Sequence, residues 1–289
     1  MTAIRPLAFS TYGETVRRPL YCILLLIAAA LIYFSKLLTL FSFYQEINAV
    51  REMGMATITL WSFLVIVITS GLVVTRELED RTAVTLLSKP LLRRDFLLGK
   101  YLGLLLALVP GIVFLTSTLY LTLWMMAWPN FPLTDADVAR GLEQGHSPFV
   151  TTAGAIWDAF ILRQGGVVLQ GSLLAFFQSA ILAALAVSFS AFLPVPVSVA
   201  AVSLAYILGN ISSYMLASVE ILGVGPLSAA GRAFTNVMPN LGYFNLQTHF
   251  SEGKIISSRY LALSFAYASL YVGAVFLVAC SLFRRREIR

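Results

Sequence analysis

Charged residues are scarce in this sequence. Asp, Glu, Lys and Arg make up only 12% of it, whereas soluble domains carry about 25%. Hydrophobic residues account for 58%, so a soluble globular domain is excluded and an integral membrane protein is indicated. The 20 basic residues outnumber the 14 acidic ones. They cluster at the ends of apolar runs, which favours anionic lipid headgroups over nucleic acid as their partner.

Cysteine and histidine are also scarce. The two cysteines, Cys22 and Cys280, fall within the expected first and last spans, where cysteine is typically a packing residue. The two histidines, His146 and His249, lie far apart in the sequence, without the spacing of metal ligands. We therefore expect no metal site and no cofactor bound directly by the chain.

Two kinds of chemistry are missing. The sequence has no GxxxxGK[ST] phosphate loop, because Gly99 and Lys100 are followed by Tyr101 and the upstream glycine is absent. No Asp or Glu lies in the middle of an expected span, where ion-coupled carriers hold their ion or proton. We therefore expect no catalytic residue, no ATP hydrolysis by the chain itself, and a membrane domain that needs an outside energy source.

Six apolar runs are long enough to cross about 30 Å of hydrocarbon, which takes roughly 20 helical residues. They predict a single all-α transmembrane domain over residues 1–289, with a kink at Pro110 in the third span. Residues 1–18 precede the first span, and their apolar positions from Ile4 to Val16 recur at helical spacing, which indicates an interfacial amphipathic helix. The expected spans are 19–41, 55–75, 101–128, 166–193, 197–217 and 260–283.

The distribution of basic residues predicts the orientation. If both termini lie on one side of the membrane, that side holds 13 of the 20 Lys and Arg residues. By the positive-inside rule, both termini and the 76–100 loop are then cytoplasmic, as in a multi-pass protein of a bacterial inner membrane. Residues 129–165 and 218–259 are then external. The second segment is largely apolar but broken by glycine and proline, so it is either re-entrant or an ordinary external loop.

The fifth span carries a small residue at every fourth position. Such a face allows a second helix to approach closely. Spacing alone leaves open whether that neighbour belongs to the same chain or to a second subunit. The candidates for a dimer interface are Ala201, Ala205, Gly209, Ser213 and Ala217.

Charge is densest in residues 76–101, which hold ten of the chain's 34 charged side chains. Such a stretch cannot lie in hydrocarbon. Acidic residues precede a short helix expected from about Arg81 to Ser88, where they favour its dipole, and Pro90 ends it. The stretch is either a dock for a partner protein or a solvated loop. Its candidate contact residues are Glu77, Glu79, Asp80, Arg81, Thr82, Leu86, Leu87, Pro90, Arg93, Arg94 and Lys100.

Residues 76–103, RELEDRTAVTLLSKPLLRRDFLLGKYLG, resemble the loop after the second span of ABC-2 type permeases, also called type V ABC exporters. The LSKP variant is similar to the multi-copper enzyme maturation branch, which includes the nitrous oxide reductase accessory permease. Arg81 stands where members commonly have glycine. The residues that match the family pattern are Glu77, Thr82, Leu86, Leu87, Pro90, Arg93, Gly99 and Lys100.

The resemblance implies the permease subunit of an ATP-driven ABC exporter. It implies a homodimer, or a pair with a related permease, bound to two cytoplasmic ATPase subunits that hold ATP and Mg²⁺. The loop between spans two and three would be the coupling helix, and spans one and five would line the dimer. The alternative is a membrane scaffold that passes ATPase motion to an external partner protein without a transport pathway. Uncharged spans favour an amphiphilic or lipid-like substrate over a free metal ion.

Overall fold

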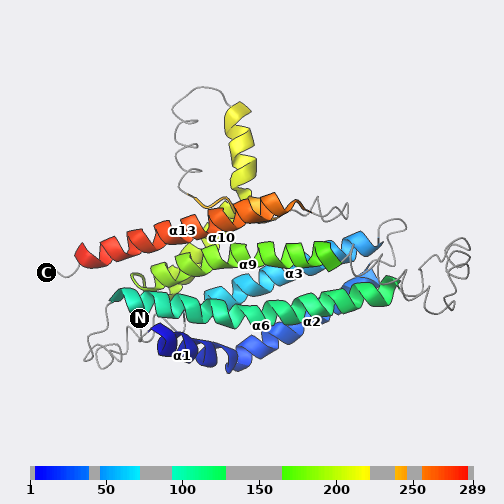
Figure 1. Cartoon of the computed structure of the whole chain (residues 1–289), viewed down its shortest axis with the longest axis horizontal. Helices are drawn as coiled ribbons and strands as arrows, with labels where there is room; N and C mark the ends of the chain where they lie inside the picture. The colour runs from blue at the N-terminus through cyan, green and yellow to red at the C-terminus, as the bar shows by residue number, and fades with distance from the viewer. Residues whose placement is uncertain are drawn as a thin grey trace, which may run out of the picture.

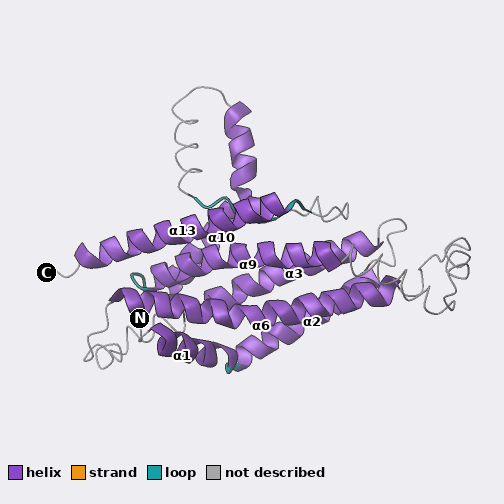
Figure 2. Cartoon of the chain, viewed as in Figure 1, coloured by secondary structure: helices purple, strands orange, loops and turns teal. Residues whose placement is uncertain are grey.

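The computed structural model describes residues 4–38, 46–71, 93–127, 165–221, 238–245 and 256–285. Every regular element in these ranges is helical, as the sequence predicts (Figure 2). Six helices are long and apolar enough to span a membrane, so the chain is a membrane-spanning helical protein. They are α2 (Pro19–Leu38), α3 (Glu46–Thr69), α6 (Arg93–Ala127), α9 (Gly165–Ser190), α10 (Val195–Ile221) and α13 (Ser258–Arg285); α1 (Ile4–Val16) and the 3₁₀ helix η4 (Leu241–Phe244) are shorter.

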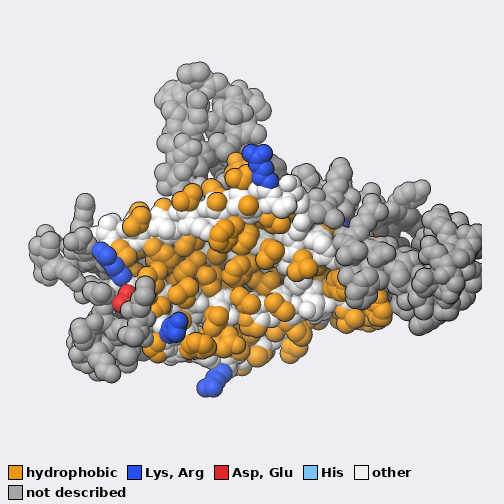
Figure 3. All heavy atoms as spheres, viewed as in Figure 1, with side chains coloured by type: hydrophobic (Ala, Val, Ile, Leu, Met, Phe, Trp, Pro, Cys, Tyr) orange, Lys and Arg blue, Asp and Glu red, His pale blue; other side chains and the backbone are white. Residues whose placement is uncertain are grey.

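The long helices run roughly along one common axis (Figure 1). Helices α3, α6 and α9 pack against one another, α2 packs on α3 and α6, and both α10 and α13 pack on α9. Helix α9 is the innermost of the described helices, because 72% of the residues in its most apolar stretch are buried. The corresponding share in α13 is 11%. Hydrophobic side chains cover the flank of the bundle (Figure 3), as contact with lipid tails requires.

Two helices begin earlier than the sequence predicts. Helix α3 begins at Glu46 instead of near residue 55, and α6 begins at Arg93 instead of near residue 101. Hydropathy marks where a helix enters hydrocarbon, but a helix continues into water wherever no residue breaks it. Arg93, Arg94 and Lys100 therefore lie on a helix rather than in a loop. The expected kink site, Pro110, lies within the continuous α6.

Prolines set the helix boundaries at two turns. Pro19 is the first residue of α2, where its fixed φ suits a helix and its missing N–H costs nothing. The residue before a proline avoids helical geometry, which separates α1 from α2. At the other turn, the Pro194 carbonyl accepts the Ser198 N–H at 2.9 Å. This bond starts α10 directly after α9, so the two helices are joined by a tight turn.

Glycines provide the closest contacts inside the bundle. Gly111 of α6 faces the ring of Trp61, and Gly54 of α3 faces Leu119, in each case with no room for a Cβ. The Tyr21 hydroxyl of α2 donates to the Ala107 carbonyl of α6 at 2.9 Å. Small residues let helices approach in lipid, where no hydrophobic force draws them together.

Buried or partly buried polar side chains make three further contacts between segments of the bundle. The Ser179 hydroxyl of α9 donates to Ser62 of α3 at 2.9 Å, and the Gln178 amide donates to Asn210 of α10 at 3.4 Å. Gln170 exchanges two hydrogen bonds with the Ile256 backbone, at 2.8 and 3.0 Å. The Gln178–Asn210 bond joins α9 to α10, whereas Gln170 joins α9 to the residues just before α13.

Residues 238–245 return to the side of the bundle. A Cβ at Gly209 would lie 2.8 Å from Leu241 Cγ and 2.9 Å from the Pro239 carbonyl oxygen. The Asn240 N–H donates to the Tyr267 hydroxyl of α13 at 3.0 Å. Gly209 and Tyr267 both lie well inside their helices, so this short segment packs below the helix ends. The remainder of the expected external segment 218–259, apart from the helical ends, lies outside the described residues.

Replacing Gly111 with alanine should destabilise the bundle. The new methyl group would overlap the Trp61 ring, and overpacking of this kind costs about 1–3 kcal/mol. The matched control is Gly273→Ala in α13, where nothing lies within 4 Å of the added Cβ. We expect Gly111→Ala to lower the thermal unfolding midpoint in detergent and Gly273→Ala to leave it unchanged or raise it. Equal midpoints for the two variants would contradict the packing of Trp61 on Gly111.

Candidate functional site

Most of the predicted contact residues of the charged stretch lie outside the described part of the chain. The described part of the chain continues at Arg93, which is the first residue of α6. Arg94 is exposed and Lys100 is buried. The predicted contact residues outside the described ranges are Glu77, Glu79, Asp80, Arg81, Thr82, Leu86, Leu87 and Pro90.

Helix α6 is longer than a membrane needs. Its 35 residues extend over about 52 Å at 1.5 Å per residue, about 20 Å more than the hydrocarbon core. Helix α1 packs along the N-terminal part of this long helix (Figure 1). The two helices therefore form a pair directly after the charged stretch.

Two glycines make the contact between α1 and α6. A Cβ at Gly99 would lie 2.5 Å from Leu7 Cδ2, and one at Gly103 would lie 2.6 Å from both the Ala8 carbonyl oxygen and Thr11 Cβ. The G-x-x-x-G spacing places both glycines on one face, where they let the backbones approach closely. Gly99, the glycine of the Gly-Lys pair in the predicted coupling motif, thus contacts the N-terminal helix.

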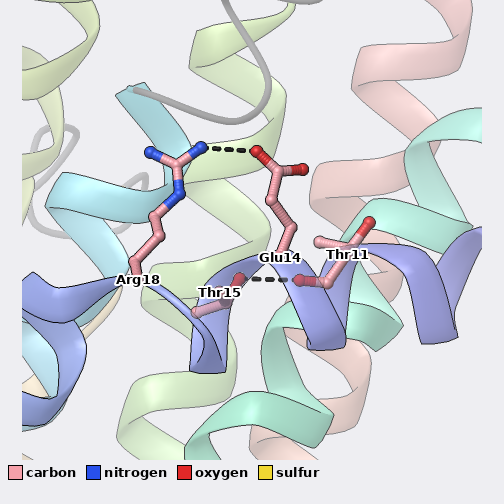
Figure 4. Close-up of polar contacts among 4 residues, drawn as sticks. All are labelled: Thr11, Glu14, Thr15 and Arg18. Carbon is pink, nitrogen blue, oxygen red and sulfur yellow. Dashed lines mark hydrogen bonds and ion pairs between the residues drawn. The ribbon is translucent and has the colours of Figure 1, made fainter.

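The buried face of α1 consists of Ala8, Thr11 and Thr15. The sequence predicts a face of larger apolar residues, and the large members of that face are only half-buried. Small residues are buried here because Gly99 and Gly103 bring the two backbones so close that larger side chains do not fit between them. The Thr11 hydroxyl donates to the Leu7 carbonyl at 3.0 Å. The Thr15 hydroxyl donates to the Thr11 carbonyl at 2.8 Å (Figure 4), so burial leaves neither hydroxyl without a partner.

An ion pair lies at the end of α1. The Arg18 guanidinium contacts the Glu14 carboxylate one turn earlier (Figure 4). Both side chains are partly exposed, so the pair contributes little to stability. It does orient Arg18 at the turn into α2.

Tyr101 connects the start of α6 to another helix of the bundle, and Lys100 beside it is buried. Lys100 is 2% exposed, and its Nζ lies 5.8 Å from the centre of the Phe96 ring. Tyr101 packs edge-on against Phe276 of α13, with ring centres 5.0 Å apart. Movement of the first turns of α6 would therefore reach α1 and α13 together.

The small-residue face of α10 packs partly within the chain. Ala205 is buried, and Gly209 faces Leu241 of the same chain, while Ala201 is half-buried. Ser213 and Ala217 belong to α10, and their side chains are outside the described set. At Gly209 the close neighbour is thus intrachain, which is one of the two alternatives that the spacing left open.

The opposite face of α10 is exposed and made of large apolar residues. They are Val197, Leu204, Ile207 and Ile211, with exposed fractions of 44–56%. The last part of α10, yellow in Figure 1, projects away from the other long helices. Sequence spacing alone did not indicate this face, because large apolar residues occur all around a membrane helix.

The apolar runs of the sequence do not predict the burial of Arg51, which precedes the second expected span. It lies in α3 and is 1% exposed. Its Nη2 donates to the Asn48 side chain at 2.9 Å. One feature of the sequence does indicate this position. Between Glu46 and the apolar run no residue breaks a helix more strongly than Gly54, so the helix of the second span can extend back over Arg51. Among the described residues, no cluster of three or more His, Cys, Asp or Glu is suited to a metal ion.

Replacing Gly103 with valine should loosen α1 from α6. The added side chain meets the Ala8 backbone, which cannot rotate away, and overpacking costs about 1–3 kcal/mol. We expect hydrogen exchange of the α1 amides to become roughly tenfold faster or more. The control is Gly13→Val on α1 itself, where a Cβ meets nothing within 4 Å. Unchanged α1 exchange in Gly103→Val would contradict the close packing of the pair.

Comparison with known proteins gives no family for this chain. No protein-family model matches it, and no curated protein matches it either. The ABC-2 resemblance therefore remains an interpretation of residues 76–103. What is established is a membrane-spanning helical protein whose 35-residue helix α6 packs against α1.

Proposed function

We propose that this chain is the permease subunit of an ATP-driven ABC exporter. Separate ATPase subunits bind and hydrolyse ATP, and they act on the membrane domain through the charged stretch 76–92. In this assignment a separate ATPase supplies the energy, because the sequence of this chain has no phosphate loop. Both termini and the charged stretch are cytoplasmic in this proposal, and the membrane is a bacterial inner membrane.

The observation that carries the proposal is the continuity of α6. It begins within the charged stretch 76–101 and runs as one helix from Arg93 to Ala127. A continuous helix transmits displacement along its axis, because its hydrogen bonds all lie within the segment. A push on the first turn of α6 would therefore be transmitted along the helix to its far end at Ala127.

The pairing of α6 with α1 supports the same proposal. Gly99 and Gly103 hold α1 against the first turns of α6, and the turn at Pro19 joins α1 to α2. Motion of the charged stretch would therefore act on the first and third spans together. In this proposal the second glycine, Gly103, lies one turn after Gly99 because both are needed to hold α1 against α6.

A membrane scaffold remains the second candidate, and the same observation favours it. A rigid α6 could pass ATPase motion to an external partner protein without any substrate pathway. Reconstitution of the chain with its ATPase in liposomes separates the two functions. ATP-dependent movement of a fluorescent amphiphile across the bilayer would support the exporter, and ATP hydrolysis without such movement would support the scaffold.

Replacing both Leu86 and Leu87 with aspartate should release the ATPase subunit. Aspartate at both Leu86 and Leu87 would have to lose its hydration inside a partner groove, and burying an unpaired charge is strongly unfavourable. We expect the double variant to lose co-purification with the ATPase. The conservative variant, with isoleucine at both positions, should retain it. Co-purification and ATPase stimulation that survive the two aspartates would overturn the coupling assignment.

We infer that the chain works as a homodimer or as a pair with a related permease. The fifth span is the proposed contact, and its exposed face is the part still open to a second subunit. In a variant whose two native cysteines are replaced by serine, cysteine at Ile207 should form intersubunit crosslinks. Cysteine at Gly209 should not, because Leu241 covers that position. Crosslinks from cysteine at Gly209 and none from cysteine at Ile207 would instead place the interface on the small-residue face.

A further inference from the structure

Helix α6 changes neighbours at Pro110. Along one side of the helix, the close contacts before the proline come from α1 and from the first turn of α2, where the Tyr21 hydroxyl donates to the Ala107 carbonyl at 2.9 Å. After the proline, the next residue on the same side, Gly111, lies against the ring of Trp61 of α3. Positions four apart are neighbours on a helix surface, so the two contacts lie one turn apart, on either side of the proline.

Pro110 and Gly111 are the weakest point of α6. Proline has no N–H to donate to the carbonyl four residues earlier, and its ring crowds that carbonyl. Glycine follows directly, and it is the next least favourable residue in the interior of a helix. Sharp bends in helices occur at such residues. Helix α6 is nevertheless continuous from Arg93 to Ala127 (Figure 1), and the contacts on either side of the proline are placed to oppose a bend there.

The Tyr21 and Trp61 rings connect these two contacts. They meet edge to face, with ring centres 5.5 Å apart and planes at 71°, and the two residues are 6% and 2% exposed. Edge-to-face aromatic pairs attract one another beyond the effect of the area that they bury. The ring pair therefore spans the proline, because Tyr21 is bonded to the turn before it and Trp61 packs on the turn after it. We call Tyr21 and Trp61 the latch.

The closed latch leaves one polar group unsatisfied. Trp61 Nε1 is buried and has no hydrogen-bond partner among the described residues. A buried N–H without an acceptor costs free energy, and the bilayer core offers no water to compensate for it. The proline adds a second such group, because the Leu106 carbonyl receives no N–H from position 110. The closed arrangement therefore does not satisfy every polar group around the proline, which lowers its advantage over an open arrangement.

We propose that Tyr21 and Trp61 latch a hinge at Pro110 and Gly111, and that helix α6 bends there when the latch opens. With the latch closed, α6 is the continuous helix of the structure and moves as one rigid element. With the latch open, the part of α6 before the proline moves together with α1, which packs along it, relative to the part after the proline. This inference goes beyond the permease assignment, because it concerns a two-state element within the bundle and requires no partner protein.

The test measures distances between spin labels by pulsed electron paramagnetic resonance, on the full chain in lipid nanodiscs. The two native cysteines are replaced by serine, and labelled chain is diluted with unlabelled chain so that only pairs within one chain are counted. The first label pair, at Arg94 and Val197, joins the first turn of α6 to the first turn of α10. The second pair, at Leu121 and Ile211, joins the same two helices beyond the hinge. All four positions are exposed.

Tyr21→Phe should open the latch, because it keeps the ring and removes the hydroxyl that bonds to Ala107. One hydrogen bond changes an equilibrium by about two- to tenfold, and we expect the ratio of bent to straight α6 to rise by that factor. A bend of about 20° would move Arg94, about 24 Å from Pro110, by roughly 8 Å. The first pair should therefore gain a second distance, and the second pair should keep its distance. The control Tyr33→Phe, at an exposed tyrosine of α2, should change neither pair.

Pro110→Ala separates a hinge from ordinary packing. Alanine restores the missing N–H and is the best helix former, so α6 should stay straight even when Tyr21→Phe is added. Three results would overturn the proposal: unchanged distances in folded Tyr21→Phe, the same second distance with proline or alanine at position 110, and an equal change in the pair beyond the hinge. If Tyr21→Phe does not fold, Trp61→Phe in the same two backgrounds decides in its place. The measurement uses no ATPase subunit, so each of these results leaves the permease assignment intact.

Discussion

The absence of water in hydrocarbon is the constraint on which this structure depends. A backbone in lipid must satisfy its own hydrogen bonds, so each span is a helix. Lipid tails are as apolar as leucine, so hydrophobic burial does not by itself drive one helix onto another. Association therefore relies on close packing and a few polar contacts. Gly111 beneath Trp61 and the Ser62–Ser179 hydrogen bond are the clearest examples.

The same rule extends to the part of α6 that precedes the membrane. Gly99 and Gly103 bring the α1 backbone against α6, and the buried side chains of α1 there are small. A pair held by small residues has little room to slide, because any displacement brings a Cβ or a carbonyl into overlap. The N-terminal helix is thus coupled to the third span at the point where the charged stretch enters it. This is what a mechanical link requires.

Two charged side chains are nevertheless buried among the described residues. Arg51 of α3 and Lys100 of α6 are 1% and 2% exposed. The Arg51 side chain donates to Asn48 at 2.9 Å, and the Lys100 ammonium lies 5.8 Å from the centre of the Phe96 ring. Each cation is therefore positioned in part by a side chain of its own helix.

The sequence by itself determined that the chain is a helical membrane protein, and it predicted the six long apolar helices that the described residues contain. Both follow from local composition. Only the tertiary structure decided where α3 and α6 begin, that Arg51 is buried, and that Gly209 packs on Leu241. Hydropathy reports where a segment contacts lipid, but helix length beyond the membrane and the identity of a neighbour depend on contacts between distant residues. That is why the same small-residue spacing allowed either a subunit interface or an intrachain contact until Leu241 was seen against Gly209.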